Sequence, residues 1–274
     1  MIRGLTERDK RGLGFVADMK VVSFIHLAQF YAPNFEPATE GPRPQRNAGE
    51  PSRGGDMRHA PWPTNLRDRI CAIARIVHRW EAWSLAQTER PWLDHPKWVW
   101  VNGAGLRRLG LDYNDAHFPD EEALDHLYQV TRIRLLVGRR PVDPEAAWFK
   151  HTWISERAMK SDYPQNTAGI VLPHLPDGAL ELDEDAEVKM AEGEKVLFRR
   201  GNRIAVEVER RRKDFRRMEE ILPDLLKHYS GVWYFCQPKA ADAVLATKLR
   251  LMQAGLLTKA QTKLIRVLDL EEKG

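Results

Sequence analysis

Residues 203–209 read RIAVEVE, a run in which valine and glutamate alternate at the end of an apolar segment. This period of two indicates a β-strand, because successive side chains of a strand point to opposite faces of the sheet. Glu207 and Glu209 are therefore expected on one face, roughly 6–7 Å apart, and Val206 and Val208 in the core. The simpler interpretation is a strand with one solvated face and no chemical role.

The segments on either side of this strand alternate between strand and helix patterns. Strands are expected over 178–182, 186–190, 195–198 and 232–236, and helices over 146–160, 214–229, 240–254 and 259–268. Pro223 should kink or split the helix over 214–229, since proline lacks the amide proton. This order of elements predicts an α/β domain with a mixed sheet over residues 146–274.

The N-terminal part begins with helical patterns. Thr6 is a candidate N-cap with Asp9 three residues on, and a second short helix is expected over 22–31. A stronger helix starts at Thr64 (TNLRDRICAIARIVHRW), with an apolar stripe along one side. Its candidate DNA-contacting side chains are Arg67, Arg69, Arg75 and Arg79.

After the basic helix, KWVWV over 97–101 indicates a tryptophan-rich strand, Asn102-Gly103 a turn, and Gly105 to Leu109 the start of a short helix. Three helices followed by a β-ribbon predict a winged helix-turn-helix domain over residues 1–118, whose third helix enters the major groove. The chain as a whole is thus expected to be an α+β protein, a winged helix-turn-helix joined to the mixed-sheet domain.

Two segments interrupt or connect these domains. Residues 32–63 are crowded with proline, glycine and charge, and indicate a flexible insertion, either a tolerated loop or one that meets a partner. Residues 121–137 (EEALDHLYQVTRIRLLV) indicate a long helix, which we interpret as a connector over 119–145.

The composition narrows the protein class. The chain has 274 residues, 30% of them charged, and a net charge of +4, a mild preference for anionic partners. The two cysteines, Cys71 and Cys236, lie in apolar segments and are expected to be buried thiols outside any disulfide or zinc site. There is no signal-peptide pattern and no apolar run near the ~20 residues that span a bilayer. A cytoplasmic protein without a membrane partner is therefore expected.

Four acidic residues are candidates for chemistry: Glu156, Asp177 in Pro-Asp-Gly before a strand, Glu207 and Glu209. Clustered carboxylates repel one another and suit a divalent cation such as Mg²⁺, which would polarise a phosphodiester, while a lysine stabilises the developing charge. Lys213 is the candidate lysine, and Asp177, Glu207 and Glu209 are the candidate metal ligands.

The basic tract 199–217 carries nine basic residues and three acidic ones. Arg210, Arg211 and Arg212 are candidates for contacts with a phosphate backbone; alternatively they pair with Asp214, Glu219 and Glu220. His174, three residues before Asp177, either orients the site, contacts phosphate or is structural. His126 and His151 lack a second ligand at metal spacing.

Several motifs together resemble the replication-relaxation family of plasmids and other mobile elements. They are LTERDKRGLGFVADMKVVSFIHLAQF (5–30), WISER (153–157), HLPDG (174–178), AVEVE (205–209) with Lys213, and YSGVWYF (229–235). The resemblance covers nearly the whole chain and implies a C-terminal domain similar to the PD-(D/E)xK nuclease fold. Carried over, it places Glu156, Asp177 and Glu207 around Mg²⁺ or Mn²⁺. Glu209 departs from the pattern by standing in the lysine position, and Lys213 would reach back instead.

Two functions follow as hypotheses. The first is a DNA-binding protein of a mobile element, acting in replication or mobilisation, with a metal-dependent site for phosphodiester hydrolysis. The alternative is a non-catalytic regulator or replication accessory factor with a degenerate nuclease fold, since fold alone does not settle function. DNA is the expected partner in both cases, together with replication or mobilisation proteins. The oligomeric state is open, a homodimer on DNA being one option.

Overall fold

A computed structural model of the chain describes residues 4–32, 65–93, 95–113, 116–139, 149–162, 173–211 and 214–270. The predicted insertion over 32–63 lies, apart from Ala32, outside the described residues, as do the candidate site residues Arg212 and Lys213.

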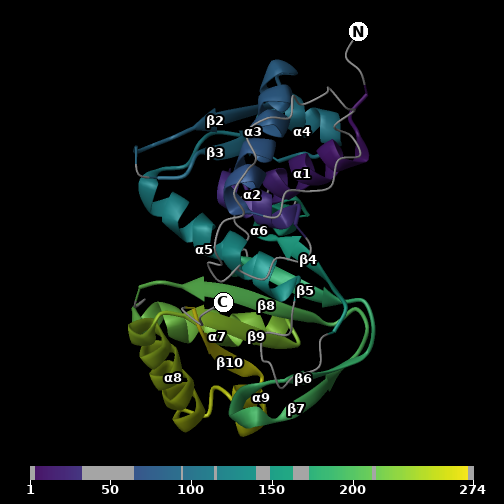
Figure 1. The fold of residues 1–274 in the computed structure, drawn as a ribbon. Helices are drawn as coiled ribbons and strands as arrows, with labels where there is room; N and C mark the ends of the chain where they lie inside the picture. Colours follow the sequence, from purple (N-terminus) through teal and green to yellow (C-terminus); the bar gives the residue numbers. More distant parts are fainter. Residues whose placement is uncertain are drawn as a thin grey trace.

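The N-terminal part contains helices packed on a small antiparallel sheet (Figure 1). Its elements are α1 (Glu7–Asp18), β1 (Val22–Ser23), α2 (Phe24–Phe30), α3 (Leu66–Ala82), β2 (Ala86–Glu89), β3 (Trp98–Val101) and α4 (Gly103–Leu109). The strand order is β1-β3-β2, with β3 antiparallel to both neighbours. The expected cap is confirmed, because Thr6 and Asp9 form a capping box at the start of α1.

Asp9 also joins α1 to α3 inside this part. Its side chain is fully buried and accepts hydrogen bonds from Arg79 at 2.6 Å and from the Trp80 indole at 2.9 Å. Burial raises the pKa of Asp9, but the hydrogen bonds from Thr6, Trp80 and Arg79 outweigh it and leave the pKa below its usual value. The ionised carboxylate therefore fixes α3 relative to α1.

The long helix α5 (Glu121–Val137) has the predicted bounds. Val130 and Ile133 on α5 belong to one continuous hydrophobic core that also includes residues of α1, α3 and the C-terminal sheet. Arg134 on α5 forms an ion pair with Asp18 at 3.1 Å, and Arg157 donates a hydrogen bond to the Ala17 carbonyl at 2.6 Å. The N-terminal and C-terminal parts are thus held together by apolar and polar contacts.

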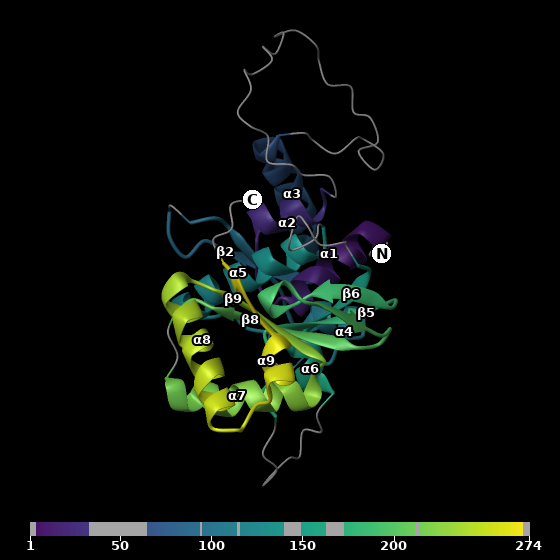
Figure 2. The same cartoon turned by 90° about the horizontal axis from the view of Figure 1, so that it is seen from below.

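The C-terminal part is a five-stranded mixed sheet with helices on one side (Figures 1 and 2). Its elements are β4 (His151–Ser155), α6 (Glu156–Ser161), β5 (Gly178–Leu182), β6 (Ala186–Lys189), η1 (Ala191–Gly193), β7 (Lys195–Phe198), β8 (Arg203–Glu209), α7 (Phe215–His228), β9 (Gly231–Cys236), α8 (Pro238–Gln253), α9 (Lys259–Lys263) and β10 (Ile265–Asp269). The order is β10-β9-β8-β5-β4, in which β8, β9 and β10 are parallel and β4, β5 and β8 antiparallel. The α+β class and the mixed sheet are therefore confirmed, and β6 and β7 form a separate hairpin.

Three expected helices differ in the structure. The segment 146–160 holds strand β4 before the short helix α6, because Thr152, Trp153 and Ile154 suit a strand and pair with β5. The segment 259–268 likewise ends in a strand, β10, which pairs with β9. The segment 22–31 begins as β1, and its helix starts only at Phe24.

Two smaller expectations are also corrected. The helix α7 continues through Pro223 without a split, since its apolar side packs against the sheet. Cys236 is buried as expected, but Cys71 is exposed because it lies on the outer side of α3. Within the described residues, no helix is both long enough and apolar enough to cross a membrane.

Candidate functional site

The strand β8 carries the paired glutamates in the middle of the sheet. Val206 and Val208 face the core shared with the N-terminal part, whereas the glutamates alternate with them and face α7 and α8, as Ala205 does. Because helices cover that face too, Glu207 and Glu209 are only 3% and 7% exposed. The simpler interpretation of a solvated strand face is therefore wrong.

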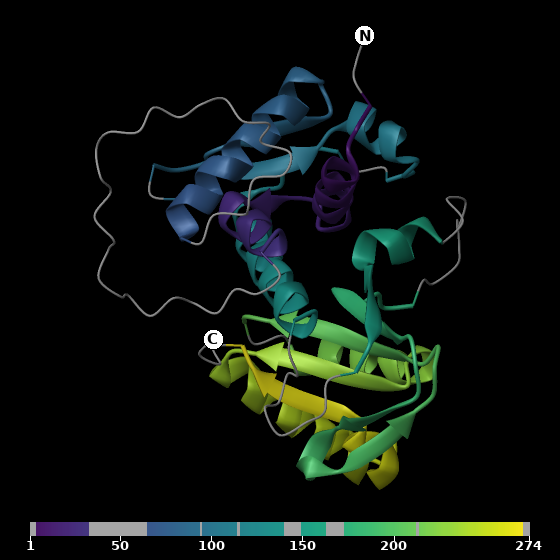
Figure 3. The same ribbon diagram turned by 45° about the vertical axis from the view of Figure 1, so that its right-hand side comes forward.

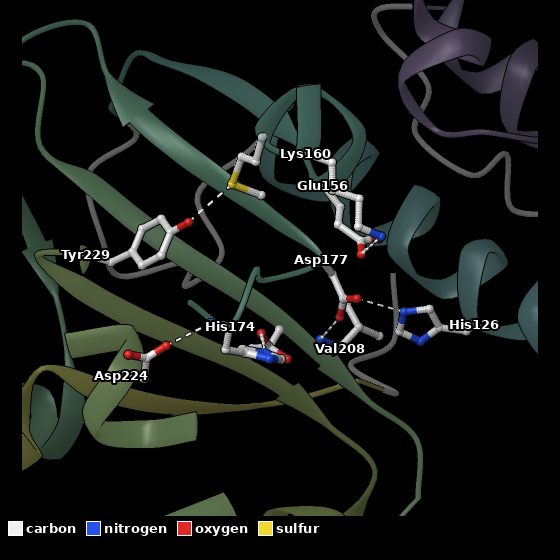
Figure 4. Close-up of polar contacts among 10 residues, drawn as sticks. His126, Glu156, Lys160, His174, Asp177, Val208, Asp224 and Tyr229 are labelled. Carbon is white, nitrogen blue, oxygen red and sulfur yellow. Dashed lines mark hydrogen bonds and ion pairs between the residues drawn. The ribbon is translucent and has the colours of Figure 1, made fainter. Parts of the chain in front are cut away.

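A histidine holds the first of these glutamates. His174 lies ahead of β5, and its Nε2 is 2.9 Å from Glu207 Oε1. The backbone N–H of His174 donates to Asp224 Oδ2 on α7 at 2.8 Å, which fixes the approach of this loop (Figure 4). This contact fixes the position of Glu207, which fits both an orienting and a structural role of His174.

Asp177 stands at the start of β5 and joins three elements (Figure 4). Its Oδ2 accepts a hydrogen bond from the backbone N–H of Val208 at 2.7 Å. This contact lies just past the last residue pair of the β5–β8 ladder, which is Gly178 with Val206. Its Oδ1 lies 2.8 Å from Nε2 of His126 on α5. Asp177 therefore closes the open end of the β5–β8 ladder and ties the connector helix to the sheet.

Glu156 is the first residue of α6, directly after β4. Glu156 lies on a helix, as expected, but at its start, because strand β4 occupies the preceding part of the helix expected over 146–160. It forms an i,i+4 ion pair with Lys160 at 2.5 Å. Glu156, Lys160 and Asp177 line one cavity of about 220 Å³ between the N-terminal and C-terminal parts, which Lys20 and Arg157 also border. Figure 4 shows the three side chains on the same side of the sheet.

Tyr234 on β9 pairs with Glu207 across the parallel β8–β9 ladder. Burial, followed by the charges of Glu207 and Glu209, raises the pKa of this phenol well above its usual value. Its hydroxyl is buried and has no hydrogen-bond partner among the described residues. The tyrosine is therefore a neutral buried group beside two carboxylates.

The arrangement bears directly on the expected metal ion. Carboxylate oxygens suit Mg²⁺ and Mn²⁺. Of the four candidate acids, however, only Glu156 and Asp177 line the cavity, beside Asp18 and Asp112, while Glu207 and Glu209 lie outside its lining. Among the described residues, no group of three or more His, Cys, Asp or Glu side chains is placed to hold a metal ion. The expected ligand set of Asp177, Glu207 and Glu209 is therefore not brought together at one site in the described residues.

The four predicted arginines of α3 differ in their surroundings. Arg67 and Arg75 are exposed, whereas Arg69 and Arg79 are half-buried. Arg79 is engaged by Asp9 and stacks over the Trp83 ring at 5.6 Å. Arg67 and Arg75 are thus the two that an external partner reaches most easily.

The arginines after β8 contact the connector helix. Arg210 pairs with Asp125 at 3.0 Å and Arg211 with Glu122 at 2.8 Å. For these two arginines the expected alternative, pairing with Asp214, Glu219 or Glu220, is not what the structure shows. The acidic partners instead come from the first turns of α5.

Comparisons of the chain with protein-family models, with curated proteins and with solved structures find no match.

Sequence reasoning missed two residues of the site. His126 approaches Asp177 from a position 51 residues away, so no local spacing announces the contact. For Lys160 the sequence does contain a signal, because it follows Glu156 by four residues, the spacing of an ion pair on a helix. The helix expected over 146–160 gave no indication that this pair lies beside a cavity.

Proposed function

We propose that this protein binds duplex DNA and that α3 is the helix that enters the major groove. The observation that carries the proposal is the outer face of α3, where Arg67, Cys71, Ala74, Arg75 and His78 are all exposed. These positions fall on one side of a helix, because residues three and four apart are neighbours. The small side chains allow close approach to a groove, while arginines read guanine or bind phosphate.

The opposite face of α3 explains how this surface is held. The core buries one side of α3 through Ile73, Ile76, Val77 and Trp80. Asp9 accepts a hydrogen bond from the Trp80 indole on this same side. Figure 3 shows α3 along the outer side of the N-terminal part, away from the C-terminal sheet. A basic helix that is fixed on one face and exposed on the other is what major-groove recognition requires.

The order of elements supports a winged helix-turn-helix in this part. Three helices precede the antiparallel pair β2 and β3, and the short β1 pairs with β3 on its other side. In this proposal the segment between β2 and β3 is the wing, which lies along the DNA backbone.

The C-terminal part supports the proposed kinship with the PD-(D/E)xK fold and the replication-relaxation family. The antiparallel strands β4, β5 and β8 are followed by the crossover helix α7 and the parallel strand β9. Asp177 directly precedes β5, and Glu207 lies on the adjacent strand β8. A role in replication or mobilisation of a mobile element, with proteins of those processes as partners, follows from this kinship.

The test of DNA binding is fluorescence anisotropy with a labelled duplex at several salt concentrations. Arg67→Gln and Arg75→Gln are compared with Lys259→Gln, which changes an exposed lysine on α9. Loss of a base contact should weaken binding by about 1–3 kcal/mol, and loss of a phosphate contact should lower the salt slope by about 1. Equal binding by all three variants and the wild type would refute the assignment of α3.

A second candidate function is metal-dependent hydrolysis of phosphodiesters. The cavity that brings Glu156, Asp177 and Lys160 together favours it, because carboxylates and cationic side chains line the same space. The other charged residues of its lining are Asp18, Asp112, Lys20 and Arg157. The assay follows nicking of supercoiled plasmid in Mg²⁺, Mn²⁺ or EDTA, for the wild type and Asp177→Asn. Metal-dependent nicking that the substitution abolishes would establish the nuclease. DNA binding without nicking would leave a non-catalytic DNA-binding factor.

A further inference from the structure

A second basic surface lies in the C-terminal part, at the ends of the parallel strands β8 and β9. A groove of about 830 Å³ opens there, lined by Arg210, Arg211, Phe215, Gln237 and Lys239 among others. It lies outside the cavity that holds Asp177 and Glu156, with which it shares no lining residue. In open α/β sheets the carboxyl ends of parallel strands commonly form the ligand-binding crevice.

The charge of the groove is predominantly positive. Arg210, Arg211 and Lys239 line it together with a single acidic residue, Asp242. Lys239 is exposed and makes no ion pair or hydrogen bond with the described residues. An anion is therefore the class of ligand that the lining favours.

Arg210 adds a second, independent indication. One side of its guanidinium pairs with Asp125, but its Nε is buried and has no hydrogen-bond partner among the described residues. A buried donor without an acceptor costs roughly 1–3 kcal/mol. Arg210 also lines the groove, and the fork of its guanidinium suits the oxygens of a phosphate.

The ion pairs that Arg210 and Arg211 make with α5 have exposed acidic partners, so a ligand in the groove can replace them. Arg211 and its partner Glu122 are 76% and 77% exposed, and Asp125 is 54% exposed. Exposed ion pairs contribute little to stability because water and salt screen them. The starts of α7 and α8 border the same groove, so the partial positive charge at these helix N-termini also favours an anion.

We propose that this groove binds a phosphate group and that the DNA backbone supplies it, as a contact separate from α3. The proposal rests on the DNA-binding function in its choice of source. A free nucleotide carries the same phosphate chemistry and is the other source to be distinguished.

The test uses the full chain with two groove variants, Lys239→Gln and Arg211→Gln. Lys259→Gln is the matched control, because it also changes an exposed lysine in the first turn of a helix but lies outside the groove. Each phosphate contact contributes about 0.9 to the salt slope of DNA binding. Each groove variant should therefore lose about one unit of slope, so that raising salt from about 50 to about 200 mM weakens its binding about threefold less than that of the wild type. The control should keep the wild-type slope.

A direct titration separates this proposal from the proposed function. ³¹P NMR of dTMP detects binding to the wild type and its loss in Lys239→Gln, and competition with unphosphorylated thymidine shows whether the phosphate is needed.

Reduced salt slopes in both groove variants support the proposal. Unchanged slopes, with dTMP binding that Lys239→Gln abolishes, overturn the DNA source and leave a nucleotide-phosphate groove. If the wild type binds no duplex at all, DNA binding fails and the dTMP titration alone judges the groove. Unchanged slopes without dTMP binding overturn the proposal.

Discussion

Asp177 offers the sharpest test of how the candidate site is built, because its two carboxylate oxygens have different partners. Asp177→Ala removes the acceptor of the Val208 N–H, which belongs to a residue only 2% exposed. An unsatisfied buried N–H costs about 1–3 kcal/mol. The contact with His126, whose side chain is 39% exposed, adds less. The loss in the free energy of unfolding should total about 2–3 kcal/mol, or roughly 5–10 °C in Tm for a protein of this size.

Asp177→Asn should behave differently. The asparagine carbonyl still accepts the Val208 N–H, and its amide donates to His126 Nε2 in the tautomer where that nitrogen accepts. We expect the free energy of unfolding to fall by less than about 1 kcal/mol. In a nicking assay the asparagine variant therefore removes the charge of Asp177 while the protein stays folded. Asp183→Ala is the control, since within the described part of the chain the Asp183 carboxylate accepts a hydrogen bond only from Thr152, in an exposed position.

The assay is thermal and urea unfolding followed by circular dichroism, with all three variants measured at one pH. The expected order of stability is wild type, then Asp183→Ala and Asp177→Asn close together, then Asp177→Ala. If the alanine and asparagine variants of Asp177 lose the same stability, the acceptor role is refuted. If neither loses any, the closure of the β5–β8 ladder does not depend on this side chain.

Three further predictions concern stability. Burial, together with two nearby guanidinium groups, lowers the pKa of His26 to about 3. In the unfolded chain this histidine binds a proton below about pH 6.5, so the free energy of unfolding should fall by about 2 kcal/mol from pH 7 to pH 5. Urea titrations of His26→Leu should lack this dependence on pH. Gly178→Ala should lose about 1–3 kcal/mol in thermal melts, because a Cβ there would lie 2.1 Å from the Trp153 ring, whereas Gly14→Ala, in open space on α1, should be neutral or gain up to about 1 kcal/mol. Tyr234→Phe removes a buried hydroxyl without a partner and should keep or raise the Tm; a loss above about 1 kcal/mol would contradict the absence of a hydrogen bond.

Much of the secondary structure could be predicted because its signals are local. The Val-Glu alternation of β8, the Thr6 cap of α1 and the apolar stripe of α3 each depend on residues a few positions apart. The sequence predicts helices where β4 and β10 form, because these two segments are stabilised as strands by their pairing with β5 and β9. Tertiary pairing commonly overrides such weak local preferences.

The candidate site divides in the same way. By itself, the sequence determined that Glu207 and Glu209 share one side of a strand, that Asp177 begins another strand, and that α3 presents arginines. Only the tertiary structure decided that helices bury both glutamates and that His126 contacts Asp177 and His174 contacts Glu207. It also decided that Glu156 and Asp177 line one cavity, whereas Glu207 and Glu209 do not. The physical reason is that periodicity sets the face on which a side chain lies, whereas its neighbours are set by the packing of segments that are distant in the chain.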